Sequence, residues 1–149
     1  YKGVDRRFDF ALRTDRHVVL SDYAHHPKEI YQSAKSMREV YHDRHITAIF
    51  QPHLYTRTRD FYADFAEALS QLDEVILCDI YPAREKPIPG VTSQLIYDRL
   101  KEGVEKSMIH KEDVLKLVES RDFDVLIILG AGDLDNYVPE IVKIIEAKH

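Results

Sequence analysis

Glycine is scarce in this chain, which contains only five in 149 residues. No G-x-x-x-x-G-K-[S/T] loop, in which a glycine-rich backbone cradles a phosphate chain, occurs among them. A complete G-x-G-x-x-G dinucleotide fingerprint is missing too. If the chain takes part in nucleotide chemistry, another domain must therefore hold most of the triphosphate.

Cysteine, long apolar runs and concentrated positive charge are also missing. The single cysteine, Cys78, cannot form an internal disulfide, which favours a reducing, cytoplasmic setting and leaves too few thiols for a zinc site. The longest unbroken aliphatic run, Val125 to Leu129, is too short to cross a bilayer. The net charge of −5 comes without the basic face typical of nucleic-acid binding. We therefore expect neither a membrane nor a nucleic acid as a partner.

The composition suits one soluble α/β domain over residues 1–149, since 44% hydrophobic residues can build a single core but the length cannot hold two ordinary domains. Residues 1–60 carry eleven Lys or Arg against eight Asp or Glu, whereas the remainder carries ten against eighteen. The mild excess in the first part suits small anions such as phosphates or carboxylates, although such asymmetry also occurs on surfaces without a ligand.

Apolar runs alternate with amphipathic stretches, which is the pattern of βαβ units and a parallel sheet. The first two strands, joined by a polar turn, predict an antiparallel hairpin that leads into the sheet. The expected strands are Phe8 to Leu12, His17 to Leu20, Ile46 to Phe50, Val75 to Cys78, one near Met108, and Val125 to Leu129. The expected helices cover Pro27 to about Tyr41, a stretch after Thr56–Thr58, one capped by Ser93, one around Val114 to Val118, and one after Asp133 or Asp135.

Apolar side chains recur at helical spacing within these predicted helices, and we interpret the stripes as core. The second helix is expected to carry Phe61, Phe65, Ala68 and Leu72 on one face. The helix capped by Ser93 is expected to carry Ile96, Leu100 and Val104.

Polar segments follow four of the expected strands. They are residues 21–27, 51–57, 81–85 and 130–133. Because the carboxyl ends of parallel strands form the crevice where ligands bind, we expect these segments to build one site.

The first segment places two histidines at a helix start, because Pro27 suits the first helical position. A helix N-terminus favours anions and disfavours imidazolium, so neutral His25 and His26 are candidates to donate to a phosphate or carboxylate. It is equally compatible with the sequence that one histidine caps the helix and the other faces solvent. We assign no metal ligand here, since the pair has no third partner.

The second segment places His53, Arg57 and Arg59 around another helix start. A guanidinium offers a planar fork that matches carboxylate or phosphate oxygens. The alternative for both arginines is a solvated face with Asp60 nearby, and Arg59 fits that alternative better. In the last segment, the glycines at 130 and 132 would let the backbone approach a ligand closely, although a G-x-G alone is often only a tight turn.

Together these segments resemble the C-terminal domain of the Mur ligases. The resemblance is carried by GVDRRFD at 3–9, DYAHHP at 22–27, FQPHLYTR at 50–57, YPARE at 81–85 with PIPG at 87–90, and GAG at 130–132. It covers essentially the whole chain, and within the family the alanine-adding branch is the most similar. It implies a Rossmann-like domain with helices on both faces of a mostly parallel sheet.

The family resemblance also implies a reaction. Such cytoplasmic enzymes of peptidoglycan synthesis have a UDP-sugar domain, a central ATPase domain with the phosphate loop, and this domain. ATP and Mg²⁺, held mainly by the central domain, activate the carboxylate of UDP-N-acetylmuramate as an acyl phosphate, which the amine of L-alanine attacks. The other two domains would thus be partners of this one, and the isolated domain is expected to be inactive. Domain closure would keep water from the acyl phosphate.

By the same resemblance, Arg7 would contact ATP and Asp22 would accept from its ribose hydroxyls. The substrate would be surrounded by Tyr23, His25, His53 and Arg57. The catalytic candidates are Arg57, which would hold the alanine carboxylate or transition-state charge, and His53 or His25, which would orient the amine or take its proton.

Two positions depart from the family pattern, and two further hypotheses stay open. Ser21 stands where many relatives carry a second aspartate, and Leu54 where some carry another arginine, which makes a two-arginine clamp doubtful. A sibling enzyme that adds a peptide to the same UDP-sugar shares much of this pattern. A stand-alone binding or regulatory domain of the same fold is the third hypothesis.

Overall fold

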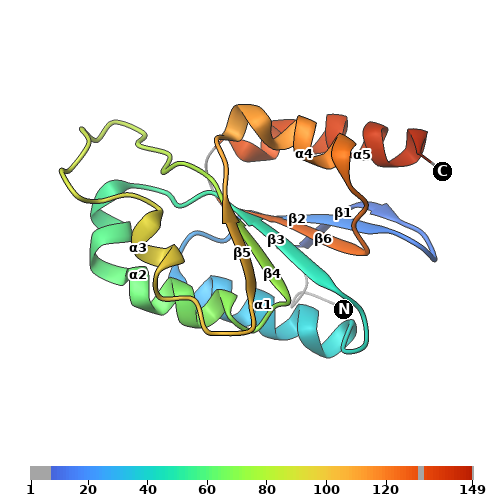
Figure 1. Ribbon diagram of the computed structural model, residues 1–149, viewed down its shortest axis with the longest axis horizontal. Helices are drawn as coiled ribbons and strands as arrows, with labels where there is room; N and C mark the ends of the chain where they lie inside the picture. The colour runs from blue at the N-terminus through green and yellow to red at the C-terminus, as the bar shows by residue number, and fades with distance from the viewer. Residues whose placement is uncertain (1–7, 131–132, 149) are drawn as a thin grey trace.

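The computed structural model describes residues 8–130 and 133–148. Strands and helices alternate along most of the chain, as Figure 1 shows. The strands are β1 (Phe8–Arg13), β2 (Val18–Asp22), β3 (Ile46–Phe50), β4 (Glu74–Leu77), β5 (Glu105–Met108) and β6 (Val125–Leu129). The α-helices are α1 (Pro27–Val40), α2 (Tyr55–Leu69), α3 (Gln94–Tyr97), α4 (Val114–Ser120) and α5 (Val138–Ala147). Short 3₁₀ turns, η2 (Lys111–Asp113) and η3 (Leu134–Tyr137), lead into α4 and α5.

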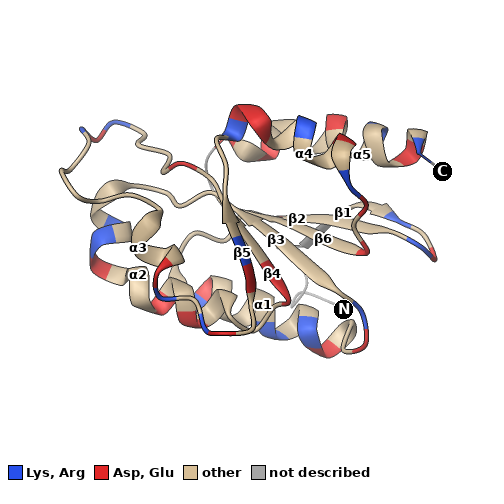
Figure 2. Ribbon diagram, in the orientation of Figure 1, with Lys and Arg blue, Asp and Glu red and all other residues tan. Residues whose placement is uncertain are grey.

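The six strands form one sheet in the order β1-β2-β6-β3-β4-β5. All neighbours are parallel except β1, which pairs antiparallel with β2. The predicted hairpin and mostly parallel sheet are therefore confirmed. The central strands β3 and β6 carry no charged residue (Figure 2), as expected for strands covered on both faces.

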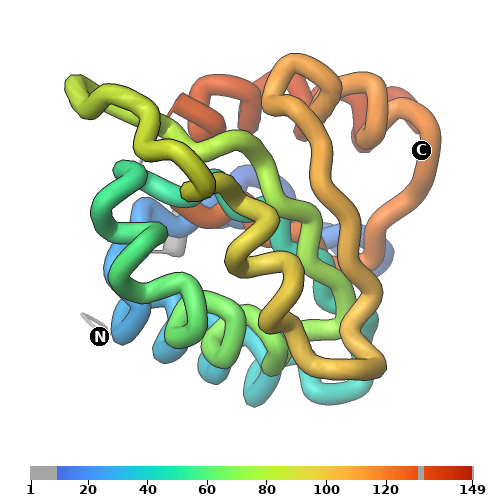
Figure 3. Tube along the Cα trace, turned by 60° about the vertical axis from the view of Figure 1, so that its left-hand side comes forward, coloured from blue at the N-terminus to red at the C-terminus, as the bar shows by residue number. Residues whose placement is uncertain are grey.

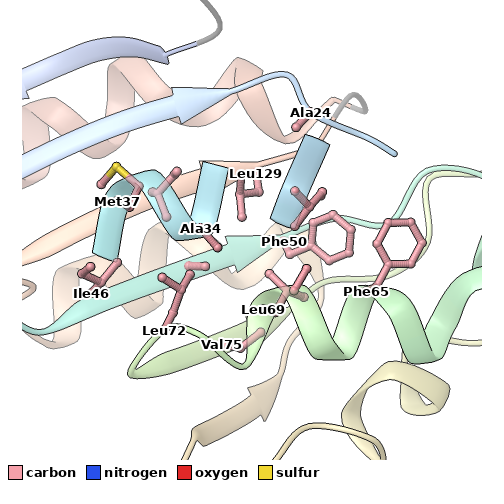
Figure 4. Close-up of a cluster of buried hydrophobic side chains, with 14 of the residues drawn as sticks. Ala24, Ala34, Met37, Ile46, Phe50, Phe65, Leu69, Leu72, Val75 and Leu129 are labelled. Carbon is pink, nitrogen blue, oxygen red and sulfur yellow. The ribbon is translucent and has the colours of Figure 1, made fainter. Parts of the chain in front are cut away.

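Helices cover both faces of this sheet. Figure 3 shows α1 and α2 in one layer and α4 and α5 in the other. The first layer packs on a core cluster that includes Phe50 and Phe65, whose rings lie 5.4 Å apart (Figure 4). The second layer packs on Ile49, Leu126 and Ile141. Alternate residues of β2, β3, β4 and β6 thus contribute to the two cores. Among the described residues, no helix is long and apolar enough to span a membrane.

Two predicted stripes are wrong in detail. The helix after Ser93 has only four residues, and the Ser93 hydroxyl donates to the carbonyl of Cys78 at 2.5 Å instead of capping it. Leu100 is still buried, but by turns beyond the helix. On α2, Phe61 is 37% exposed, and its backbone lies outside the helical region (φ −128°, ψ 15°) at a kink in the helix.

An ion pair between buried Glu74 and partly exposed Arg121 lies at the start of β4, at the end of the strand opposite the polar loops. The Glu74 side chain is 6% exposed and accepts from both Nη atoms of Arg121, at 2.8 and 2.6 Å, and from the Thr47 hydroxyl at 3.2 Å. The Arg121 guanidinium holds the pKa of the Glu74 carboxyl below its ordinary value. This pair therefore stabilises the fold at neutral pH.

We expect Glu74→Gln to lower the free energy of unfolding at pH 7 by about 1–3 kcal/mol, because it weakens a charge-assisted hydrogen-bond pair. A depressed folded-state pKa contributes stability above the unfolded pKa of about 4.3, and this contribution is lost as the pH falls through the folded value. Urea unfolding at pH 7 and pH 3 measures the difference, which should shrink at pH 3. The exposed Glu119→Gln is the control; an equal effect of both variants would contradict this role.

Candidate functional site

The three predicted catalytic side chains meet at the carboxyl edge of the sheet. His25 lies between β2 and α1, His53 lies between β3 and α2, and Arg57 is in the first turn of α2. The imidazoles of His25 and His53 lie 6.0 Å apart between ring centroids, and Arg57 Nη1 is 3.0 Å from His53 Nδ1. The loops that carry them leave the same edge of the sheet in Figure 1. Tyr23 is on the same loop as His25, but it is 59% exposed.

The contact with Arg57 fixes the tautomer of His53. A guanidinium can only donate, so Nδ1 of His53 must accept and the neutral ring must carry its proton on Nε2. Burial, the charge of Arg57 and the neighbouring His25 lower the pKa of His53, in that order of importance. His53 is therefore a neutral N–H donor at neutral pH.

His25 has the opposite arrangement. Its Nδ1 lies 3.3 Å from the carbonyl oxygen of Tyr23, which can only accept, so Nδ1 carries the proton when the ring is neutral. The second nitrogen, Nε2, then holds a lone pair. The two neutral imidazoles thus differ at Nε2, which is a donor in His53 and an acceptor in His25.

Internal carboxylates occupy both helix N-termini of the site. Glu29 Oε1 accepts from the backbone N–H groups of His25 and His26, at 3.2 and 3.1 Å, at the start of α1. Glu85 accepts from the backbone N–H groups of Tyr55 and Thr56, at 2.6 and 3.1 Å, at the start of α2. Of the described groups at this edge, the side chains of Arg57 and the two histidines are thus the candidates for anion recognition.

The segment between β3 and α2 is held in a strained conformation by the segment after β4. Leu54 has φ 75° and ψ 137°, a combination that is costly for a residue with a side chain. Its N–H donates to the carbonyl of Tyr81 at 2.8 Å, and the Tyr81 ring stacks on His53 with centroids 5.7 Å apart. We predicted no role for Tyr81 or Glu85 individually; their place in a proline-rich loop at a strand end was the available signal.

Other predicted residues have different surroundings. Asp22 ends β2 but is only 1% exposed, and its carboxylate accepts from the Ala24 N–H at 2.9 Å and from the Ser33 hydroxyl. A ribose contact would require this carboxylate to be uncovered. Exposed Arg59 pairs with its neighbour Asp60 at 2.9 Å, which supports the solvated alternative for that arginine. Arg7, Ala131 and Gly132 lie outside the described residues.

A cavity of about 810 Å³ opens beside this cluster, at the ends of β4 and β5. Its wall includes Tyr55 and Tyr81 but none of the predicted catalytic residues. Within residues 8–130 and 133–148, the groups that could hold a metal ion are Asp79, His110 and Glu112, and His45, Glu74 and Glu105. Neither group includes one of the predicted catalytic residues.

Comparisons with known proteins identify the family of this chain. A family model described as "Mur ligase, glutamate ligase domain" matches residues 6–132. The chain is 65% identical over 148 residues to UDP-N-acetylmuramate–L-alanine ligase of Phocaeicola vulgatus, covering 99% of this chain and 32% of the relative. The same enzyme of Porphyromonas gingivalis is 54% identical, with 93% and 30% covered. The chain thus spans about a third of these relatives.

Solved structures show the same similarity. UDP-N-acetylmuramate-alanine ligase of Thermotoga maritima superposes with a TM-score of 0.76 at 28% identity, over 97% of this chain and 30% of that one. A murein peptide ligase from Psychrobacter arcticus reaches a TM-score of 0.73 at 15% identity, over 94% and 30%. The second likeness shows the fold alone.

Proposed function

Because the chain belongs to the Mur ligase family, we propose that it is the C-terminal domain of an ADP-forming ligase that joins L-alanine to the carboxylate of UDP-N-acetylmuramate in cytoplasmic peptidoglycan synthesis. The identity of 65% to an alanine-adding ligase, over almost the entire chain, is the observation that carries this proposal. The absence of a phosphate loop from the sequence agrees with it, since a central domain would then hold most of the ATP and the Mg²⁺.

In this proposal the domain supplies the amino-acid site. The alanine amine attacks the acyl phosphate, the tetrahedral intermediate expels inorganic phosphate, and the amine gives up a proton. Arg57 holds the alanine carboxylate or the developing negative charge, because its half-buried guanidinium faces the site. His53 donates from Nε2 to an oxygen of the reacting group, whereas His25 orients the amine or accepts its proton at Nε2. Tyr23 would close over the substrate when the domains meet.

The nucleotide contacts remain proposals for Arg7 and Asp22. A cationic Arg7 suits the ATP phosphates, and Asp22 would have to be uncovered to reach the ribose. The partners in this scheme are the UDP-sugar and ATPase domains of the same ligase, and the substrates are L-alanine, UDP-N-acetylmuramate and ATP.

The test is to sequence the parent reading frame upstream of Tyr1 and to assay the encoded protein. We expect a central domain with a Gly-Lys-Thr-type phosphate loop, and ADP release that depends on both L-alanine and UDP-N-acetylmuramate. The 149-residue chain alone should release no ADP. ADP release with a peptide but not with L-alanine would identify the peptide-adding sibling, and a gene that starts beside Tyr1 would reject the ligase proposal.

The opposite tautomers of the two histidines give a separate prediction. Glutamine can replace an imidazole Nε2–H donor but cannot accept a proton. In the full ligase we therefore expect His53→Gln to keep most activity, within about tenfold, and His25→Gln to lose about 10²-fold or more, the range of a general base. Measuring kcat for both variants at saturating substrates checks this. Equal losses would contradict the assignment.

A further inference from the structure

The loop after β4 is tied to the segment that carries His53. Tyr81 forms an isolated parallel bridge with His53, and its N–H donates to the Pro52 carbonyl at 2.7 Å. Its own carbonyl accepts from the Leu54 N–H at 2.8 Å. The pairing of β3 with β4 is thus continued past both strand ends, where the two loops hold each other in register.

Four residues further on, Glu85 reaches the first turn of α2. Its carboxylate accepts from the N–H of Tyr55, from the N–H of Thr56 and, at 2.5 Å, from the hydroxyl of Thr56. The hydrogen bond from the Thr56 hydroxyl is the main reason why the pKa of Glu85 lies below its ordinary value. A carboxylate in this position satisfies N–H groups that no intrahelical partner can reach. The residue before α2, Leu54, has no side-chain acceptor that could do so.

This capping bears directly on Arg57. Its guanidinium reaches back four residues to His53, so the pair depends on the conformation of the backbone between them. The strained Leu54 lies in that segment. A strained backbone persists only where its surroundings hold it, and Glu85 contacts the two residues that follow the strained position.

We propose that Glu85 is a positioning residue, which holds Arg57 and His53 in the donor–acceptor pair that the site uses, by supplying from another loop the cap that α2 lacks. The inference rests on the proposed function for its role in ligation. The geometric part, that Glu85 maintains the pair, holds for the chain itself.

The pKa of His53 provides a test, because two possible roles of Glu85 predict shifts of opposite sign in the Glu85→Ala variant. The charged or titratable groups that face His53 are Arg57, His25 and Glu85, with Tyr81 stacked on the ring. Glu85 raises the pKa of His53 through its charge and Arg57 lowers it. If Glu85 acted only through its charge, Glu85→Ala would lower the pKa of His53 further. If Glu85 instead holds Arg57 in place, removing Glu85 lets the Arg57 guanidinium move away from His53, and the pKa of His53 rises.

The experiment is an NMR titration of His53 in this chain for the parent, Glu85→Ala, Glu85→Gln and the exposed neighbour Lys86→Ala. We expect the pKa of His53 to rise in Glu85→Ala alone. Glutamine at position 85 keeps an acceptor oxygen for the N–H groups of Tyr55 and Thr56. A fall or no change in Glu85→Ala overturns the proposal, as does a rise in Lys86→Ala. Because no activity is measured, this result is independent of the ligase assignment.

The full ligase provides the second readout. Glu85→Ala should raise the KM for L-alanine and reduce kcat/KM by about 100-fold, the cost of a misplacement on the order of 1 Å, whereas the KM for ATP stays unchanged. Formate should restore part of the lost activity by binding as an anion at the vacated N-terminus of α2. Equal changes in both KM values, or no rescue by formate in a folded variant, would show that Glu85 has only a general structural role.

Discussion

Arg57→Ala in the full ligase should reduce alanine-dependent ADP release by a hundredfold or more, about 2.7–4 kcal/mol in barrier. The reason is that the guanidinium contacts His53 in the site, and that Glu85 already accepts from the first N–H groups of α2, so these groups do not replace the lost cation. The measurement is ADP release at saturating UDP-N-acetylmuramate with L-alanine varied.

The matched control for this prediction is Arg59→Ala. Arg59 is on the same helix two residues later, but it is exposed and pairs with its neighbour Asp60. We expect its removal to change ADP release less than twofold, since Arg59 is a solvent-exposed residue whose ion pair with Asp60 contributes little. Arg57→Lys should recover little activity, because an ammonium lacks the planar fork. Near-normal turnover in Arg57→Ala would remove this residue from the site.

Gly130→Ala should destabilise the chain by about 3 kcal/mol or prevent it from folding. Gly130 ends the central part of the sheet with φ 132°, where residues with a side chain are strained. A Cβ at this position would lie 2.6 Å from the backbone carbonyl oxygen of Gln51, well inside contact distance. Because Gln51 precedes the His53 segment, the substitution would also push the site apart.

Two other glycines separate the steric effect from the backbone effect. Gly90 (φ 81°) and Gly103 (φ 92°) also have positive φ, but an added Cβ would meet nothing within 4 Å. We expect Gly90→Ala and Gly103→Ala to cost only about 1–2 kcal/mol, the penalty of the backbone conformation. Urea unfolding of the three variants measures the difference. Equal losses would show that the close approach to Gln51 is unimportant.

Much of the fold could be predicted from apolar patterning. The β3 and β6 strands match the predicted runs Ile46 to Phe50 and Val125 to Leu129, because uninterrupted branched residues suit strands buried on both faces. The start of α1 was also predicted, since Pro27 fixes φ at a first helical position. The length of α3 could not be predicted, because Leu100 and Val104 have helical spacing but are packed by turns after Tyr97.

The residue types at the site, and the strand ends that carry them, were determined by the sequence itself: His25 follows β2, and His53 and Arg57 follow β3. Local pattern was sufficient for this because strand ends in a parallel sheet share one edge. Only the tertiary structure decided which atoms of the two imidazoles donate, since each tautomer is set by a partner. It also decided that Glu85, some thirty positions beyond Tyr55, caps α2. Such contacts join loops that are distant in sequence, and no periodicity along the chain encodes them.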